Sequence, residues 1–331
     1  MAAGPKENTL ITSALCMTDK FLLSRADPPL LELYSFLQQE RLIDSYKIPG
    51  PATSLTWGAK TGSILVAVGE AALLLEVDSS LKLVQKNQIN IPQSHSLAVL
   101  SYSNSLIGTA GENGVLQVWK QQGNTYSKVL SESLHTAPVT GLDFSPDEDL
   151  VATSSLDRSC KVFSLKESKL IKNLVFSQHE DSPDLAFQGV KFSRSGDILY
   201  TVACDTYTFV TQWDVLSEMR PISSHLIHAS PTTCFSISQD GFFLGIGTED
   251  GWVKTLNTRT MELERDSEDL SSAVKSISFT QESRHIIAVA DNQFECIFHG
   301  RSEGLFSKAS KIWVVCLFLL WLYLYLKNSS P

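Results

Sequence analysis

The stretch from His135 to Phe163 reads H-T-A-P-V-T-G-L-D-F-S-P-D-E-D-L-V-A-T-S-S-L-D-R-S-C-K-V-F and predicts three short β-strands. Alternation of apolar and polar residues predicts strands at Val139 to Phe144, Leu150 to Ser154 and Cys160 to Phe163. A Ser-Pro-Asp turn and a Leu-Asp-Arg-Ser turn separate them. A single sheet of this kind cannot bury its own faces, so we expect the pattern to recur along the chain.

The pattern does recur, at separations of 42, 43, 44, 48, 45 and 42 residues. The residues expected to end the first strand of each unit are Leu15, Trp57, Leu100, Phe144, Phe192, Ile237 and Phe279. The residues expected to begin the second strand are Phe21, Ile64, Leu106, Leu150, Ile198, Phe243 and Ile286. Seven such units are enough to close a ring, which would remove most exposed strand edges.

Two further landmarks keep the same period. A polar residue occupies the turn before the third strand at Asn113, Asp157, Asp205, Asp250 and Asn292. An aromatic or apolar residue ends the third strand at Phe36, Trp119, Phe163, Trp213, Leu256 and Phe298. A β-sandwich, the main competing architecture, would not keep so steady a period over about 290 residues.

The central unit resembles a WD repeat. Its His135, the Phe-Ser-Pro-Asp turn, the Ala-Thr-Ser-Ser strand and Asp157, 22 positions after the histidine, carry the resemblance. The resemblance implies an all-β, seven-bladed WD-repeat-type β-propeller over residues 1–300, in which His135 bonds the turn at Asp157. Phe163 stands where the usual tryptophan would complete that network. The resemblance marks as structural blade residues His135, Asp157, Trp119, Trp213 and Asp214.

The composition of the chain restricts the functions and the cellular compartment that we expect. The chain is 43% hydrophobic and 19% charged, and its formal charge of −9 argues against a nucleic-acid surface. The densest acidic run, Glu262 to Asp269, is expected on a solvated outer strand or loop, with a basic partner as the alternative. The six cysteines form no C-x-x-C pair, and we expect small buried hydrophobic side chains in a reducing compartment.

No catalytic or metal-binding pattern stands out. The glycines from Gly245 to Gly251 have the wrong spacing for a nucleotide loop, and those from Gly58 to Gly62 lack the upstream glycine of a phosphate loop. His225 and His228 have no carboxylate or cysteine at zinc-ligand spacing. A propeller without an active site predicts a rigid platform whose loops on one rim bind protein partners.

The carboxyl-terminal residues do not continue the repeat pattern and form one long apolar run instead. Residues 312–326 are 15 uncharged residues without a polar helix face, bracketed by Lys311 and Lys327. They would rise about 22 Å at about 1.5 Å each, whereas a typical hydrocarbon core is about 30 Å thick. The thinner bilayer of the endoplasmic reticulum, about 27 Å, and snorkelling of the two lysines make up the difference. We expect one transmembrane helix.

The flanking charges predict the orientation of this helix. Arg301, Lys308 and Lys311 lie in a short basic linker, residues 301–311, and only Lys327 follows the helix. The positive-inside rule therefore places the propeller in the cytosol and the tail, residues 327–331, in the lumen. The amino terminus lacks the apolar core of a signal peptide. We expect a single-pass protein of the endoplasmic reticulum membrane.

Several repeat segments, together with the expected anchor, resemble one family. The segments are V-T-G-L-D-F-S-P-D from Val139, F-Q-G-V-K-F from Phe187, C-F-S-I-S-Q-D-G-F-F-L-G-I-G-T-E-D-G from Cys234 and V-K-S-I-S-F-T from Val274. They are similar to the guanine-nucleotide exchange factors of the endoplasmic reticulum, the prolactin regulatory element-binding protein family, which act on the Sar-type GTPase of COPII vesicles. The resemblance implies exchange activity, a Sar-type GTPase as partner, and COPII components or cargo as further partners.

One departure from that family concerns the first blade. In the family this blade carries a long glycine-rich loop that binds potassium and contacts the GTPase. Here only R-A-D-P-P, Arg25 to Pro29, joins the two strands, with no glycine, lysine or asparagine. We therefore expect no potassium site and no other cofactor, and the corresponding contact residues would be Asp27, Pro28 and Leu30. The alternative is a non-catalytic scaffold or cargo-exit helper that has lost exchange activity, as the related plant phosphate transporter traffic facilitator implies.

Overall fold

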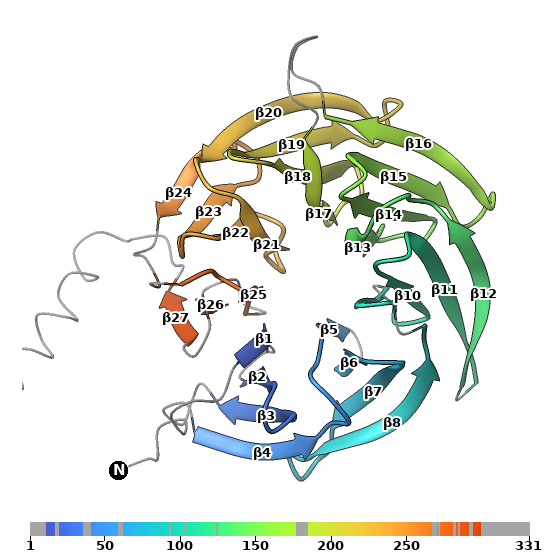
Figure 1. Cartoon of the computed structure of the whole chain (residues 1–331), viewed down its shortest axis with the longest axis vertical. Coiled ribbons are helices and arrows are strands. Elements are labelled where there is room, and N and C mark those ends of the chain that lie inside the picture. Colours follow the sequence, from blue (N-terminus) through green and yellow to red (C-terminus); the bar gives the residue numbers. More distant parts are fainter. Residues whose placement is uncertain are drawn as a thin grey trace, which may run out of the picture. The chain divides into compact units, whose positions relative to one another are not determined.

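The described strands form a β-propeller. The computed structural model describes residues 11–298 apart from residues 17–19, 36–40, 59–61, 93, 102, 124, 177–184, 267–269, 271, 281–282, 284 and 291–293. Within these residues six sheets have four strands and one sheet has three. The sheets lie around a ring (Figure 1), which confirms the all-β propeller prediction. The chain divides into two units, Met1–Ile297 and Phe298–Pro331, and the ring belongs to the first.

The strands of each sheet follow one another in sequence. The first strands are β1 (Ile11–Cys16), β5 (Ser54–Gly58), β9 (Leu97–Leu100), β13 (Val139–Phe144), β17 (Ala186–Phe192), β21 (Thr232–Ile237) and β25 (Ser276–Phe279). The second strands are β2 (Lys20–Arg25), β6 (Ser63–Val68), β10 (Leu106–Ala110), β14 (Leu150–Ser155), β18 (Ile198–Cys204), β22 (Phe243–Thr248) and β26 (His285–Val289). The predicted ends of the first strands and starts of the second strands agree with these bounds to within one residue.

The third and fourth strands complete the sheets toward the outside of the ring. The third strands are β3 (Leu30–Ser35), β7 (Ala71–Val77), β11 (Val115–Gln122), β15 (Ser159–Ser164), β19 (Thr208–Asp214), β23 (Val253–Asn257) and β27 (Phe294–Phe298). The fourth strands are β4 (Arg41–Lys47), β8 (Leu83–Asn90), β12 (Thr125–Ser133), β16 (Lys169–Val175), β20 (Arg220–His228) and β24 (Leu263–Asp266). The acidic run that begins at Glu262 thus includes an outer strand, as predicted.

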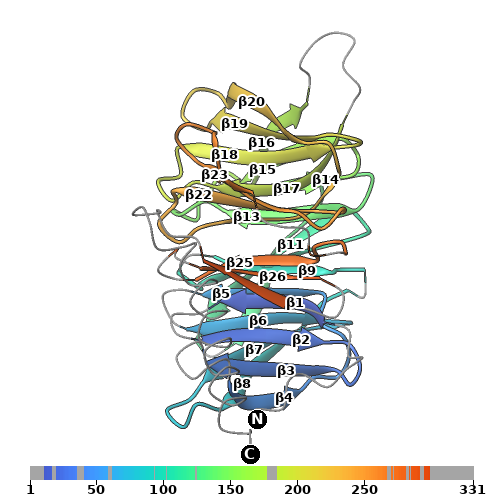
Figure 2. The same ribbon diagram turned by 90° about the vertical axis from the view of Figure 1, so that its left-hand side faces the viewer.

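The ring closes between the first sheet and the last. Strand β1 contacts both β25 and β5, so the first strands lie next to one another around the centre. The inner strands run roughly along the ring axis (Figure 2). Each hairpin reverses the chain, and this divides the connections between two ends of the ring. Face A carries the turns between second and third strands and the links from one sheet to the next; face B carries the turns between first and second and between third and fourth strands.

Burial follows the position of a strand within its sheet. Every residue of β6 (S-I-L-V-A-V) is buried, because this strand is covered by a neighbouring sheet on both sides. The outer strand β12 (T-Y-S-K-V-L-S-E-S) has no buried residue. Apolar side chains fill the space between neighbouring sheets; one such cluster joins Ala152 and Val162 of the fourth sheet to Phe187 and Trp213 of the fifth. The sheets are therefore stabilised by packing against one another.

Hydrogen bonds also join neighbouring sheets. On face B the Glu148 carboxylate accepts bonds from the Ser103 amide at 2.6 Å and the Ser105 hydroxyl at 2.7 Å. Nearer the middle, the Thr140 hydroxyl donates to the Phe187 carbonyl at 2.6 Å. These hydrogen bonds cross the boundary between neighbouring sheets and help to fix the position of one sheet relative to the next.

The expected membrane anchor lies outside the described residues. This applies to the basic linker 301–311, the segment 312–326 with its flanks Lys311 and Lys327, and the tail 327–331. Among the residues that the structure describes, no helix is long and apolar enough to cross a membrane.

Candidate interaction surface on face A

The short turn of the first sheet lies on face A. It brings Asp27, Pro28 and Leu30 together between β2 and β3, with Asp27 and Pro28 exposed and Leu30 half-buried. The Pro29 carbonyl accepts a hydrogen bond from the Ile48 amide at 3.2 Å. The turn is therefore tied to the link between the first and second sheets and presents a small, fixed surface.

A buried ion pair lies directly beneath this turn. Arg25 Nε is 2.5 Å from Glu32 Oε2, and their side chains are only 5% and 14% exposed. The Tyr34 hydroxyl donates to the same Glu32 oxygen at 2.8 Å, and its ring stacks on Phe21 at 5.1 Å between centroids. Burial lowers the pKa of Arg25, but its bonds to Glu32 and Tyr34 outweigh this effect and raise it overall. This pair holds the two strands in register where the turn begins.

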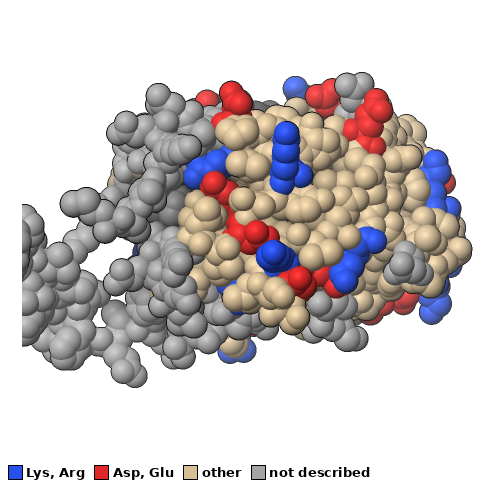
Figure 3. Space-filling model, turned by 90° about the horizontal axis from the view of Figure 1, so that it is seen from below, with Lys and Arg blue, Asp and Glu red and all other residues tan. Residues whose placement is uncertain are grey.

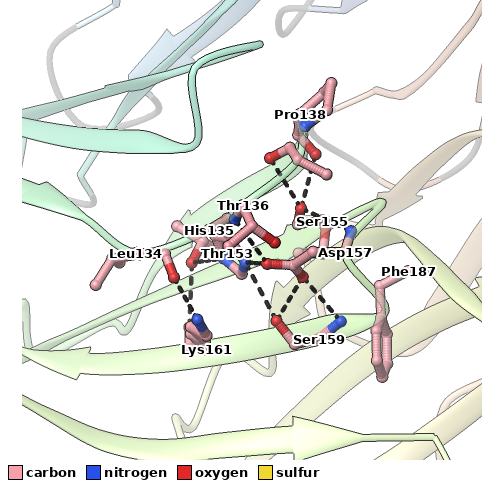
Figure 4. Close-up of polar contacts among 12 residues, drawn as sticks. Leu134, His135, Thr136, Pro138, Thr153, Ser155, Asp157, Ser159, Lys161 and Phe187 are labelled. Atoms are coloured by element: carbon pink, nitrogen blue, oxygen red, sulfur yellow. Dashed lines mark hydrogen bonds and ion pairs between the residues drawn. The ribbon is translucent and has the colours of Figure 1, made fainter.

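His135 forms a second polar network on face A (Figure 4). Its Nδ1 lies 2.9 Å from Asp157 Oδ2 and its Nε2 lies 2.8 Å from Thr153 Oγ1. Asp157 also accepts bonds from the Thr136 amide at 3.1 Å and the Ser159 hydroxyl at 2.6 Å. The network ties the link into the fourth sheet to the turn between β14 and β15, so its part is structural.

Burial and hydrogen bonding together set the charge states within this network. Burial lowers the pKa of His135 in spite of the nearby Asp157 carboxylate, so the imidazole is neutral at neutral pH. Burial alone would raise the pKa of Asp157, but bonds from Ser159 and Thr136 and the nearby His135 hold it below its usual value. The network therefore consists of a neutral imidazole and an ionised carboxylate.

Related networks use the tryptophans of other sheets. Trp213 Nε1 donates to Thr201 Oγ1 at 2.8 Å in the fifth sheet. In the third sheet the Thr109 hydroxyl lies 3.4 Å from Trp119 Nε1 and 3.0 Å from Nδ1 of His95. Asp214 instead accepts bonds from the Leu216 and Ser217 amides at 3.0 and 3.1 Å and shapes the next hairpin.

Sequence reasoning missed two histidines of this kind. His228 Nε2 lies 2.9 Å from Asp250 Oδ2, and these residues are 22 positions apart, as are His135 and Asp157. That spacing was visible in the sequence and could have identified the pair. His95 also precedes the first strand of its sheet, but its distance in sequence from the end of that strand differs from that of His135. Only the folded structure shows that it reaches Thr109.

The described turns between second and third strands make face A acidic. They include one exposed base, Arg158, and two exposed apolar side chains, Leu156 and Tyr207, which are 42% and 49% exposed. The outer side at β4 and β8, in contrast, intersperses charges of both signs among uncharged groups (Figure 3). Face A thus suits a basic protein surface better than a phosphate backbone. The exposed carboxylates in these turns belong to Asp27, Glu70, Glu112, Asp205, Glu249 and Asp250.

A polar channel of about 510 Å³ runs between the first strands of the ring. Within it, Lys191 Nζ lies 3.0 Å from Asp143 Oδ1, and the same carboxylate accepts the Phe192 amide at 2.8 Å. The described residues contain no group of His, Cys, Asp and Glu side chains that could hold a metal ion. Among the described lining residues Asp143 is the one carboxylate, and it bonds the neighbouring sheet.

Cys160, Cys204 and Cys234 are free thiols. Burial raises the pKa of Cys160 and raises that of Cys234 to about 12. Their thiolates are therefore scarce at neutral pH. Cys160 and Cys204 are buried, as predicted, whereas Cys234 is only partly buried.

Comparison with known proteins supports the resemblance to WD repeats. The family "WD domain, G-beta repeat" matches residues 127–164. The chain resembles WD-repeat proteins. It is 29% identical over 49% of its length to Protein ROOT INITIATION DEFECTIVE 3 of Arabidopsis thaliana, covering 38% of that protein.

Some of the relatives are named for SEC12. SEC12-like protein 1 of Arabidopsis thaliana is 22% identical over 70% of this chain and 58% of its own length. Guanine nucleotide-exchange factor SEC12 of Mus musculus is 25% identical over 53% of this chain and 44% of its own. The chain spans about half the length of these relatives, and the names of the relatives point to different roles.

Proposed function

We propose that this chain is a guanine-nucleotide exchange factor at the endoplasmic reticulum membrane, which activates a Sar-type small GTPase and so starts COPII vesicle budding. The observation that carries the proposal is similarity to the two SEC12-named relatives along a chain that folds as a propeller. The proposal includes seven blades, one for each sheet, and a transmembrane helix at residues 312–326 with the propeller in the cytosol.

Face A is the proposed GTPase contact. An exchange factor acts by binding the nucleotide-free GTPase more tightly than the nucleotide-bound form, which lowers nucleotide affinity by the same factor. The six carboxylates of face A would attract a basic surface, while Leu156 and Tyr207 offer apolar contact at the fourth and fifth sheets. Asp27, Pro28 and Leu30 lie at the edge of the same face, so this small turn would be one contact among several.

A specific observation favours a second function, a non-catalytic scaffold or cargo-exit helper. The turn between β2 and β3 is short, and the buried pair Arg25–Glu32 holds its base. Such a turn offers no glycine-rich loop that could reach into a GTPase. In this alternative, face A would bind the GTPase, COPII components or cargo without releasing nucleotide.

Nucleotide release separates the two functions. The purified full chain, reconstituted in vesicles, is mixed with a Sar-type GTPase loaded with fluorescent GDP, and the rate of GDP release is measured. Release well above the spontaneous rate supports the exchange factor. Unchanged release with the GTPase still bound to the vesicles supports the scaffold, and absence of both binding and release contradicts the proposal.

Location and orientation need a separate measurement. Protease added to intact microsomes should digest the propeller and leave a short membrane-protected fragment. Protection of the whole chain would contradict a cytosolic propeller, and recovery of the undigested chain in the soluble fraction would contradict the anchor.

A further inference from the structure

We propose that a patch of face A on the fifth and sixth sheets, made by Tyr207 together with Asp205 and Glu249, binds an exposed arginine of the protein partner. The inference rests on the proposed function, in which that partner is the Sar-type GTPase, and it names the chemical group that the propeller recognises. It also places the main contact in these two sheets and not at the short turn of the first sheet.

Tyr207 presents an aromatic ring without a partner. It ends the three-residue turn between β18 and β19, and it is 49% exposed. Within the part of the chain that the structure describes, its hydroxyl makes no hydrogen bond and its ring makes no aromatic or cation–π contact. Tyrosine is one of the residue types enriched at the hot spots of protein interfaces. Burial of this ring on a partner would therefore be favourable.

Two carboxylates of the same region are not neutralised within the protein. Asp205 begins the turn that Tyr207 ends, and Glu249 lies in the corresponding turn of the sixth sheet, between β22 and β23; both are exposed. Among the described residues neither carboxylate accepts a hydrogen bond or forms an ion pair, whereas Asp250 is paired with His228. The charges of Asp205 and Glu249 are therefore available to a cationic group.

Hydrogen bonds to one link hold the two turns next to each other. The fifth and sixth sheets are neighbours in the ring (Figure 1), and residues 229–231 join β20 to β21. The Thr208 hydroxyl, directly after the exposed tyrosine, donates to the Ser230 carbonyl at 2.7 Å. The Glu249 amide donates to the carbonyl of the next residue, Pro231, at 2.9 Å. Both turns are thus fixed to adjacent residues of the same link.

The effect of the two carboxylates on a nearby thiol agrees with this placement. Burial is the main reason that the pKa of Cys204 is raised, and the negative charges of Asp205 and Glu249 raise it further, against the opposing effect of a bond with the Thr232 backbone. Cys204 is the last residue of β18, immediately before the turn. Both charges therefore lie close to the point where this turn begins.

A second aromatic ring makes the outer side of the region rigid. The half-buried indole of Trp252 lies 6.5 Å from the His228 ring, measured between centroids, and 5.5 Å from Lys254 Nζ. His228 is the cross-strand partner of Thr208. The charge of Lys254 is balanced by Asp266, at 2.6 Å. A partner would therefore meet a surface that is already ordered, which lowers the entropic cost of binding.

An arginine side chain suits both parts of this patch. Its planar guanidinium stacks on an aromatic ring and also donates hydrogen bonds to carboxylates. Anionic lipid headgroups and a nucleic-acid backbone would be repelled by Asp205 and Glu249. A purely apolar partner would bury these carboxylates without a hydrogen bond, which is costly. The combination of a free aromatic ring and two free carboxylates therefore favours a protein with an exposed arginine.

Equilibrium binding to the full chain tests the contact. The chain is reconstituted in vesicles, and its affinity for the nucleotide-free Sar-type GTPase is measured by flotation at high salt, where long-range attraction is screened. Tyr207→Ala should weaken binding at least about thirtyfold, as expected of a hot spot, whereas Tyr207→Phe keeps the ring and should not. Asp205→Asn combined with Glu249→Gln should weaken binding at least about tenfold. Phe242→Ala is the matched control, because this aromatic residue is 44% exposed in a face B turn.

The arginine itself is identified from the partner's side. Each exposed arginine of the GTPase is replaced by glutamine in turn. One replacement should weaken binding to the unsubstituted chain and have little further effect on the Tyr207→Ala chain, because the two groups act through one contact. Equal affinities of the Tyr207→Ala and Phe242→Ala chains, or the absence of any arginine coupled to Tyr207, would overturn the inference. Weaker self-association of the Tyr207→Ala chain with unchanged GTPase affinity would indicate a second copy as the occupant and would also overturn it.

GDP release measured on the same vesicles tests the proposed function separately. If the unsubstituted chain binds the GTPase and releases GDP, and Tyr207→Ala changes neither, the contact is wrong while the function stands. If the unsubstituted chain neither binds nor releases, the proposed function fails and the inference fails with it. Thermal unfolding of each variant confirms that the exposed substitution leaves the propeller folded.

Discussion

At the scale of single residues, the His135 network predicts a loss of stability on substitution. His135→Ala leaves the Asp157 carboxylate and the buried Thr153 hydroxyl without their imidazole partner. Loss of a partner for such groups costs about 1–3 kcal/mol, to which the loss of packing adds. Urea unfolding of purified protein should show this decrease, whereas His225→Ala, on an outer strand, should change the free energy of unfolding by less than about 0.5 kcal/mol. Equal effects of the two substitutions would contradict a structural role for His135.

The same histidine predicts how stability changes with pH. Burial lowers the pKa of His135 in the folded protein, and also that of His95, whereas an unfolded histidine titrates near about 6.5. The unfolded chain therefore binds protons first, so stability is fully present above pH of about 6.5 and is lost as pH falls through the histidine range. Unfolding free energies measured between pH 7.5 and 5.5 should decrease, and His135→Gln should flatten this dependence. A rise in stability on acidification would contradict the neutral imidazole.

At the scale of elements, two ion pairs can be compared: Arg25–Glu32, buried beneath the first-sheet turn, and Glu218–Arg220, which is exposed. Glu32→Gln removes the negative charge from buried Arg25, and breaking a buried pair by removing one partner costs about 3–5 kcal/mol. Glu218→Gln is the matched control, because the Glu218–Arg220 side chains are 77% and 73% exposed. This exposed pair should contribute about 0–1 kcal/mol. Thermal unfolding of both variants distinguishes the two, and an equally small effect of Glu32→Gln would show that the turn does not depend on the pair.

At the scale of the whole molecule, the exposed carboxylates of face A predict salt-dependent binding. Exposed charges are screened over about 8 Å at physiological ionic strength, so association of a Sar-type GTPase with face A should slow as salt is raised. Replacing Glu112, Asp205 and Glu249 by their amides should lower the association rate by about tenfold at low salt and weaken its salt dependence. Stopped-flow binding measures both quantities.

A control for this charge effect exists on the opposite face. Replacing the exposed Asp147 and Asp149 by asparagine alters charge in a face B turn and should leave the association rate unchanged. If the face B variant slowed association as much as the face A variant, the partner would be attracted by net charge alone and face A would not be the contact.

The sequence by itself determined the repeating hairpins. Val139–Phe144, Leu150–Ser155 and the turn between them depend on local alternation and on side chains that bond the adjacent backbone, so short-range pattern was sufficient. The spacing of His135 and Asp157 was similarly readable, because it repeats a known unit. The anchor at residues 312–326 stays a prediction, since it lies outside the described residues.

Only the tertiary structure decided which residues share a surface. The contact of Gln212 with Thr258 joins positions 46 apart. His95 reaches Thr109 over 14 positions, whereas His135 reaches Thr153 over 18. Alternation along one strand says which side chains are buried, but it carries no information about the register between neighbouring sheets. Ring closure sets that register, and with it the grouping of the acidic turns on face A.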